Sequence, residues 1–180
     1  MLNFTVAARD LGVGVNTVKA WLSVLEATHQ VVVLRPYFAN IGKRLVKTPK
    51  VFFADTGTLC YLMGLKDPDH ARSGPMAGAI FETAVVNEVI RRYAHEGKEP
   101  RLYFWRPATG TEVDLVVDDG GRLIPIEVKS SSTPNREMVK GIEVFRKDFK
   151  AKATRGFLIH AGAVRLPLGF DAVALPLSAL

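Results

Sequence analysis

Two acidic residues and one lysine stand at positions that a purely structural role explains poorly. Asp114 lies between Val113 and Leu115 in TEVDLVV, so a carboxylate interrupts a stretch typical of a buried strand. Glu127 and Lys129 alternate with apolar side chains in LIPIEVKS, and they therefore project together from one face of that strand. A hairpin between the two segments would place Asp114 beside both of them.

Clustered carboxylates of this kind predict a cation. Two acids repel each other, and burial increases the cost unless a positive charge joins them. Their hard oxygen atoms suit Mg²⁺ or Mn²⁺, and such an ion activates water for attack on a phosphate ester. Glu82, in an apolar helical segment, is a further acid that would face the same site. We expect Asp114, Glu127 and Glu82 to be metal ligands, with Lys129 stabilising developing negative charge.

An ion pair explains the same residues without a metal. In this interpretation, Lys129 neutralises Glu127 or Asp114 and the group has no catalytic role. The spacing by itself is common in proteins, so the residues alone leave both interpretations open.

The second half of the chain has the periodicity of alternating helices and strands. A helix is predicted over 77–95 and an amphipathic helix over 135–149. The expected strands are RLYFWRP, TEVDLVVDD, GRLIPIEVKS, GFLIH and DAVALPL, and a turn at Asp119, Gly120 and Gly121 joins the second to the third. This order predicts an α/β sandwich over residues 76–180.

The first half predicts a small winged helix-turn-helix domain over residues 1–65. A short helix over 7–11 and a glycine turn precede a helix from the N-cap Asn16 to about 27. Val18, Trp21, Leu22 and Leu25 are expected to form its buried stripe. Strands over 31–37 and 45–55 flank a basic loop, which would be the wing, and another helix follows over 57–64. The segment 65–76, rich in proline, glycine and charge, is the expected boundary.

Composition excludes several classes of protein. The 180 residues are 48% hydrophobic and 23% charged, which disfavours disordered, collagen-like and coiled-coil chains. The single cysteine, Cys60, excludes an internal disulfide and a zinc site built from cysteines. No apolar run approaches the length that crosses a bilayer, so we expect a cytoplasmic protein without a membrane partner.

The positive charge of the chain makes nucleic acid a candidate partner. Lysine and arginine number 24 against 18 acidic residues, which gives a net charge of +6. The residues expected to contact phosphates are Lys43, Arg44, Lys47 and Lys50 around the basic loop and Lys19 in the preceding helix. That helix also carries Glu26 and few side chains suited to reading bases, so DNA binding is expected to be non-specific. A solvated basic face is the alternative interpretation.

The segments GAIFETAVVNEV, TEVDLVV and IPIEVKSS resemble the PD-(D/E)XK nuclease superfamily. The resemblance implies a restriction-endonuclease-like sandwich with a mixed sheet, and Glu82, Asp114, Glu127 and Lys129 as the catalytic residues of a metal-dependent DNA nuclease. Val113 stands where the motif has its proline.

The whole chain resembles the C-terminal half of a prokaryotic AAA+ ATPase family, in which a winged helix and this nuclease-like domain follow the ATPase. LGVGVNTVKAWLSVLE, RPYFANIGKRLVKTPKVFFADTG and the closing LPLSAL carry the resemblance. No GxxxxGK[ST] phosphate loop occurs here, so ATP would bind only to an upstream module absent from this chain. We therefore expect a fragment or a truncated gene product.

Three functions follow from these patterns. The first is a metal-dependent nuclease. The second is an inactive nuclease-like module that binds DNA or docks a protein. The third is a regulatory part of an ATPase that acts through contacts with the missing ATPase module or with other proteins.

Overall fold

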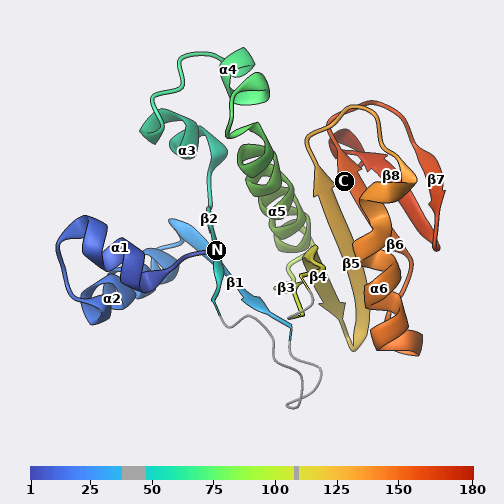
Figure 1. Cartoon of the computed structure of the whole chain (residues 1–180), viewed down its shortest axis with the longest axis horizontal. Coiled ribbons are helices and arrows are strands. Elements are labelled where there is room, and N and C mark those ends of the chain that lie inside the picture. The colour runs from blue at the N-terminus through green and yellow to red at the C-terminus, as the bar shows by residue number, and fades with distance from the viewer. Residues whose placement is uncertain (38–47, 108–109) are drawn as a thin grey trace.

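The computed structural model describes residues 1–37, 48–107 and 110–180. Within these residues, the strands form one eight-stranded mixed sheet in the order β2-β1-β3-β4-β5-β6-β8-β7 (Figure 1). The strands are β1 Val31–Pro36, β2 Lys50–Phe53, β3 Arg101–Trp105, β4 Val113–Asp119, β5 Arg122–Lys129, β6 Gly156–His160, β7 Leu166–Gly169 and β8 Ala172–Pro176. The expected mixed α/β class is confirmed.

Of the helices in the described residues, α1 and α2 precede β1, η3 follows β8, and the others lie between strands. The α-helices are α1 Phe4–Leu11, α2 Val15–Ala27, α3 Thr56–Leu62, α4 Pro68–Ser73, α5 Ala77–His95 and α6 Lys140–Phe149. Three short 3₁₀ helices are η1 Arg136–Val139, η2 Lys150–Lys152 and η3 Leu177–Ala179. None of the helices in the described part of the chain combines the length and the apolar character needed to cross a membrane.

The β4–β5 hairpin sets the register of the strands that carry the predicted acids. Its two-residue turn is Gly120 and Gly121, whose φ angles of 64° and 90° favour glycine. The turn makes Leu115 pair with Ile126 in an antiparallel ladder. Asp114, one residue before Leu115, is thereby brought to the part of β5 that holds Glu127.

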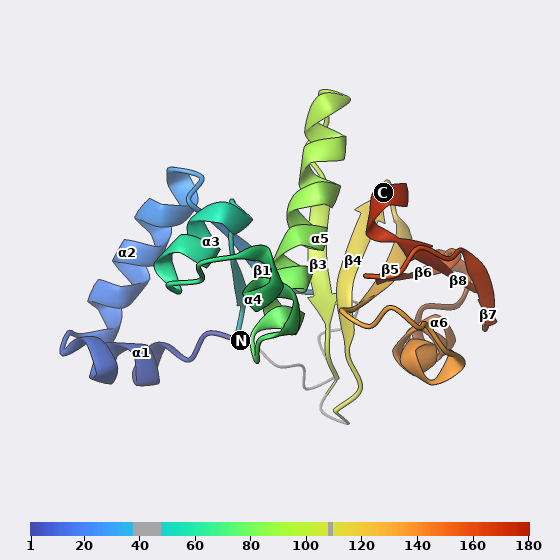
Figure 2. The same ribbon diagram turned by 90° about the horizontal axis from the view of Figure 1, so that it is seen from above.

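Two helices cover opposite faces of the sheet. Val85, Val86 and Val89 of α5 pack with residues of β4 and β5 in one core cluster. Phe145 of α6 packs with Trp105 and Val116 in another cluster. Figure 2 shows α5 and α6 on the two sides of the strands. The layered arrangement leaves one end of β4 and β5 between the two helices, and the predicted acids lie there.

The sheet continues across the expected boundary between the two halves. β1 pairs with β2 antiparallel and with β3 parallel, through Arg35 with Tyr103 and Pro36 with Phe104. Leu34 and Phe52 from the first half also belong to the core cluster beneath α5. The segment expected to be a boundary contains α4, whose N-cap is Asp67. The two halves therefore share one sheet and one core.

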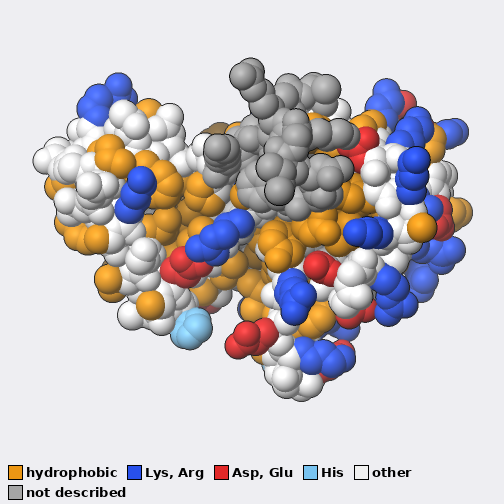
Figure 3. Space-filling view, turned by 90° about the horizontal axis from the view of Figure 1, so that it is seen from below, with side chains coloured by type: hydrophobic (Ala, Val, Ile, Leu, Met, Phe, Trp, Pro, Cys, Tyr) orange, Lys and Arg blue, Asp and Glu red, His pale blue; other side chains and the backbone are white. Residues whose placement is uncertain are grey.

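Several expectations for the first half need correction. Gly14, not Asn16, precedes α2, and no side chain caps that helix. The stripe predicted to be buried is buried only at Val18, because Trp21 is 50% and Leu25 is 43% exposed. Among the described residues, α2 packs mainly on α1 and β1, which leave these two side chains partly uncovered. In Figure 3, hydrophobic side chains are accordingly visible on the surface of this half.

The remaining differences are local. The sequence patterns do not predict β7, because its four residues include Pro167 and Gly169, which are disfavoured inside strands. The second expected strand begins only at Lys50, and residues 38–47, with Lys43, Arg44 and Lys47, lie outside the described residues.

Candidate functional site

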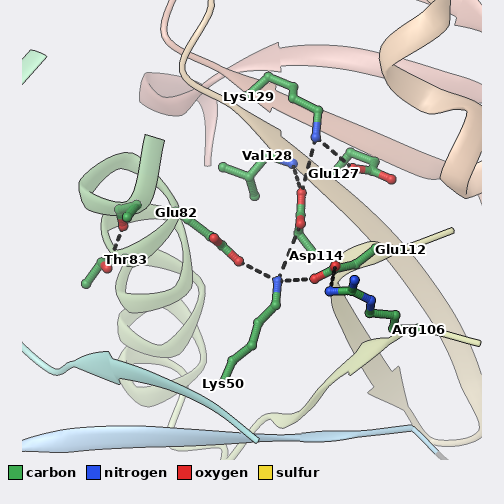
Figure 4. Close-up of polar contacts among 10 residues, drawn as sticks. Lys50, Glu82, Thr83, Arg106, Glu112, Asp114, Glu127, Val128 and Lys129 are labelled. Atoms are coloured by element: carbon green, nitrogen blue, oxygen red, sulfur yellow. Dashed lines mark hydrogen bonds and ion pairs between the residues drawn. The ribbon is translucent and has the colours of Figure 1, made fainter. Parts of the chain in front are cut away.

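The four residues expected to form a catalytic site come together where α5 meets β4 and β5 (Figure 4). Lys129 Nζ lies 3.2 Å from Glu127 Oε2 and 3.6 Å from Asp114 Oδ2. The backbone N–H of Val128 donates to Asp114 Oδ2 at 3.0 Å, which fixes that carboxylate against β5. Glu82 approaches from α5, and a further cation links it to Asp114.

That cation is Lys50, from the first residue of β2. Its Nζ lies 2.8 Å from Glu82 Oε1, 2.6 Å from Glu112 Oε1 and 3.5 Å from Asp114 Oδ1. Lys50 is only 9% exposed, and its ammonium lies 5.6 Å from the centre of the Phe104 ring. The expectation that Lys50 contacts nucleic-acid phosphates is therefore wrong for this arrangement, because its ammonium is buried against carboxylates.

Glu112 and Arg106 are members of the site that the sequence patterns did not single out. Arg106 Nη1 lies 3.1 Å from Glu112 Oε2, so this carboxylate is shared between Arg106 and Lys50. A signal for Glu112 existed, because it lies two residues before Asp114 and strand side chains alternate. Lys50 gave no such signal, since only the tertiary fold brings β2 to the acids.

Glu127 is the most deeply buried acid of the group, with 4% of its surface exposed. Burial and the neighbouring Asp114 carboxylate raise the pKa of Glu127 to about 9. The backbone of α6 passes directly beside it: a side chain at Gly141 would collide with Glu127 Oε1 and with the carbonyl oxygen of Glu112. Glycine at this position therefore lets α6 close over the buried acid.

Burial and the neighbouring lysines shift the pKa values of Asp114 and Glu82 in opposite directions. Although burial opposes ionisation, Lys50 and Lys129 hold the pKa of Asp114 below its ordinary value. Burial raises the pKa of Glu82 despite the opposing effect of Lys50. Burial also works against both lysines, yet the surrounding acids raise the pKa of Lys50 and of Lys129, so both ammonium groups stay charged. The site thus holds four acids and three cations, the third being Arg106.

The carboxylate oxygens of the site are of the type that binds a divalent cation, but they are not arranged around a position that such an ion could occupy. Carboxylate oxygens are the ligands that Mg²⁺ and Mn²⁺ prefer. Among the described residues, however, no group of three or more His, Cys, Asp or Glu side chains is arranged to hold a metal ion. The oxygens of Glu82, Glu112 and Asp114 converge instead on the Lys50 ammonium, at distances typical of charged hydrogen bonds or somewhat longer.

The pKa of Glu127 predicts a pH-dependent stability in metal-free buffer. A carboxyl whose pKa is about 9 in the folded chain and 4.5 in the unfolded chain stabilises the fold fully below pH 4.5. That contribution is lost as the pH rises through 9. Glu127→Gln, which keeps the shape of the protonated acid, should therefore melt several degrees above wild type at pH 9 and near it at pH 4.5. Thermal unfolding with EDTA at both pH values measures this.

Glu137→Gln is the control for that measurement, because Glu137 is an exposed glutamate that pairs with Lys140. Its melting temperature should differ from wild type by the same small amount at both pH values. A Glu127→Gln difference that does not grow with pH would contradict the raised pKa.

Other cations of the described chain lie on the surface. Lys19, on α2, is exposed and lies over the Phe4 ring at 5.7 Å, so it is free to face a phosphate. A second exposed basic group belongs to α6 and η2, and lysine and arginine side chains cover the corresponding end of the face in Figure 3. Its exposed lysines are Lys140, Lys147, Lys150 and Lys152. The sequence patterns did not identify this group.

The two halves of the chain match two different family models. Residues 77–180 match a domain of unknown function (DUF4143), and residues 1–69 match another (DUF8612). The chain is 33% identical over 171 residues to "Uncharacterized protein Rv2008c" of Mycobacterium tuberculosis and to "Uncharacterized protein Mb2031c" of Mycobacterium bovis. The match covers 94% of this chain but 36% of each relative, so the chain spans about a third of their length. No solved structure matches the chain.

Proposed function

We propose that residues 76–180 of this chain, which belongs to the DUF4143 domain family, form a PD-(D/E)XK-type nuclease domain. Its reaction is the metal-dependent hydrolysis of phosphodiester bonds in DNA. Residues 1–65 form a winged helix that contributes to DNA binding, and any use of ATP would depend on an ATPase module outside these residues.

A single observation carries this proposal. Asp114, Glu127 and Lys129 meet within 3.6 Å on neighbouring strands, and Glu82 enters the same group from a helix more than thirty residues earlier in the chain. Sequence spacing and family resemblance required this grouping for a nuclease site. An accidental ion pair needs only two of the four residues, so their convergence favours a catalytic origin.

The residues have distinct roles in the proposed reaction. Asp114, Glu127 and Glu82 would hold Mg²⁺ or Mn²⁺, which when bound would supply an activated water and neutralise charge on the phosphate. Lys129, whose side chain is 40% exposed, reaches solvent. It would stabilise the negative charge that develops on the phosphate oxygens. The Val128 N–H keeps Asp114 oriented during this step.

A second function is favoured by Lys50. Its ammonium already contacts three carboxylates, as a permanent ion pair would in a nuclease-like domain that has lost catalysis. In that case the chain binds DNA or docks a protein, and the acids contribute to folding only.

A cleavage assay distinguishes the two functions. Labelled single-stranded, duplex and branched DNA are incubated with the chain in millimolar Mg²⁺ or Mn²⁺, with EDTA as the chelator control. We expect nicking or cleavage of at least one form with either metal and none with EDTA. If every form of DNA showed only the same low level of cleavage with and without EDTA, the result would support the inactive module instead.

DNA binding itself is expected to be electrostatic and insensitive to sequence. Fluorescence anisotropy of two unrelated duplexes should give similar affinities at one salt concentration, because few base-reading side chains are available on α2. Between about 50 and 200 mM salt, affinity should fall by on the order of a thousandfold if about six phosphates are contacted. Lys150→Ala should lower the slope of log affinity against log salt by about one. A strong preference for one duplex would show that α2 reads bases.

A further inference from the structure

The site contains a cation of its own, and that cation comes from the other half of the chain. Lys50 belongs to the segment that matches one family, whereas the acids it contacts belong to the segment that matches the other. Figure 4 shows its side chain rising from β2 to a point between Glu82 of α5 and the acids Asp114 and Glu112. Lys50 therefore joins the two halves at the place where the nuclease proposal needs a metal.

Three features suit Lys50 to leave that position. It is the first residue of β2, an edge strand of four residues that pairs only with β1 within the described chain. Its charge is at the end of a long flexible side chain. Its three partner oxygens come from α5, from β4 and from the residue before β4, so no single element encloses it.

Charge balance shows what can replace it. The acids Glu82, Glu112, Asp114 and Glu127 face the cations Lys50, Lys129 and Arg106, so the fully ionised group carries one excess negative charge. Exchanging the single charge of Lys50 for the double charge of a divalent ion would balance the four carboxylates. With Lys50 in place, the fully ionised group is thus one positive charge short, and a divalent ion in its place would supply that charge.

We propose that Lys50 is an autoinhibitory cation that holds the carboxylates closed and must withdraw before Mg²⁺ or Mn²⁺ binds. The inference rests on the proposed function, because it concerns the metal of that same site. It makes the position of the N-terminal half a control on the nuclease site. A change that pulls β2 away from α5, such as DNA binding by that half, would open the site.

The test compares the affinity of wild type and Lys50→Met for Mn²⁺ alone by isothermal titration calorimetry. Methionine keeps much of the length of the side chain and removes the charge. We expect Lys50→Met to bind Mn²⁺ at least tenfold more tightly than wild type, because the ion no longer competes with an ammonium. Lys147→Met, which removes an exposed lysine paired with Glu143, should bind like wild type.

Thermal unfolding provides a readout that does not depend on activity. Without metal, Lys50→Met removes the ammonium that Glu82 contacts and leaves Glu112 and Asp114 only their second cations, Arg106 and Lys129, so it should melt below wild type. Millimolar Mn²⁺ should restore most of the loss, and it should raise the melting temperature of wild type much less. Should the variant be unfolded without metal, recovery of its circular dichroism spectrum on adding Mn²⁺ gives the same answer.

The possible outcomes distinguish failure of the autoinhibitory role of Lys50 from failure of the proposed nuclease function. Tight Mn²⁺ binding that is equal in wild type and Lys50→Met would overturn the autoinhibitory role while leaving the nuclease proposal intact. Destabilisation of Lys50→Met that Mn²⁺ does not relieve, with no Mn²⁺ binding by either protein, would overturn both and make Lys50 a permanent structural ion pair.

Discussion

Asp114→Asn should reduce metal-dependent DNA cleavage by at least about three orders of magnitude, the largest effect that we expect from any single substitution. Asparagine keeps the size of the side chain and one carbonyl oxygen for the Val128 N–H, but it loses the charge that would hold a divalent ion. Initial rates of cleavage at saturating Mn²⁺ measure this loss.

Two comparisons make that result specific. Asp119→Asn changes an exposed aspartate at the end of the same strand, which pairs with Arg122, and it should cleave DNA like wild type. Lys129→Ala should lower the rate, because Lys129 would act on the phosphate, and should leave Mn²⁺ affinity nearly unchanged or slightly raised by the loss of a competing cation. Cleavage by Asp114→Asn at the wild-type rate would remove this carboxylate from the reaction.

Gly141→Ala should destabilise the fold by about 1–3 kcal/mol or more, although alanine normally favours helices over glycine. The added methyl group would collide with the Glu112 carbonyl oxygen and with Glu127 Oε1. A backbone oxygen cannot rotate away as a flexible side chain can, so α6 would have to shift. For a chain of this size, the melting temperature should fall by at least about 2–4 °C per kcal/mol.

Gly78→Ala is the matched control. Gly78 is also the second residue of a helix, but an added methyl group there would meet only Ser130 Oγ, at 3.9 Å. Chemical denaturation should therefore show Gly78→Ala to be equal to wild type or more stable by up to about 1 kcal/mol. If Gly141→Ala were equally well tolerated, α6 would not be packed against Glu127 as closely as described.

The elements around the acids could be predicted because local patterns determine them. Alternation in TEVDLVVDD and GRLIPIEVKS, with two glycines between, is enough to specify a hairpin, and the hairpin register brings Asp114 to Glu127. The apolar stripe of α5 likewise fixes which side of that helix, and therefore of Glu82, faces the sheet.

The contacts between distant segments could not be predicted in this way. Lys50 and Asp114 are separated by 64 residues, and their meeting depends on the parallel pairing of β1 with β3, which no local periodicity encodes. A basic stretch before a strand is usually exposed to solvent and therefore available to phosphates, so the sequence alone predicts that Lys50 faces DNA. Periodicity also predicts which side chains of α2 share a face but not whether anything covers that face, and Trp21 is half exposed for this reason.

Crystals of Lys50→Met grown with millimolar Mn²⁺ would test the metal site most directly, through the anomalous scattering of manganese, because this variant lacks the ammonium that contacts the acids. We expect an anomalous peak bound by Asp114 and Glu127. Absence of any peak at these acids would contradict a metal-dependent nuclease.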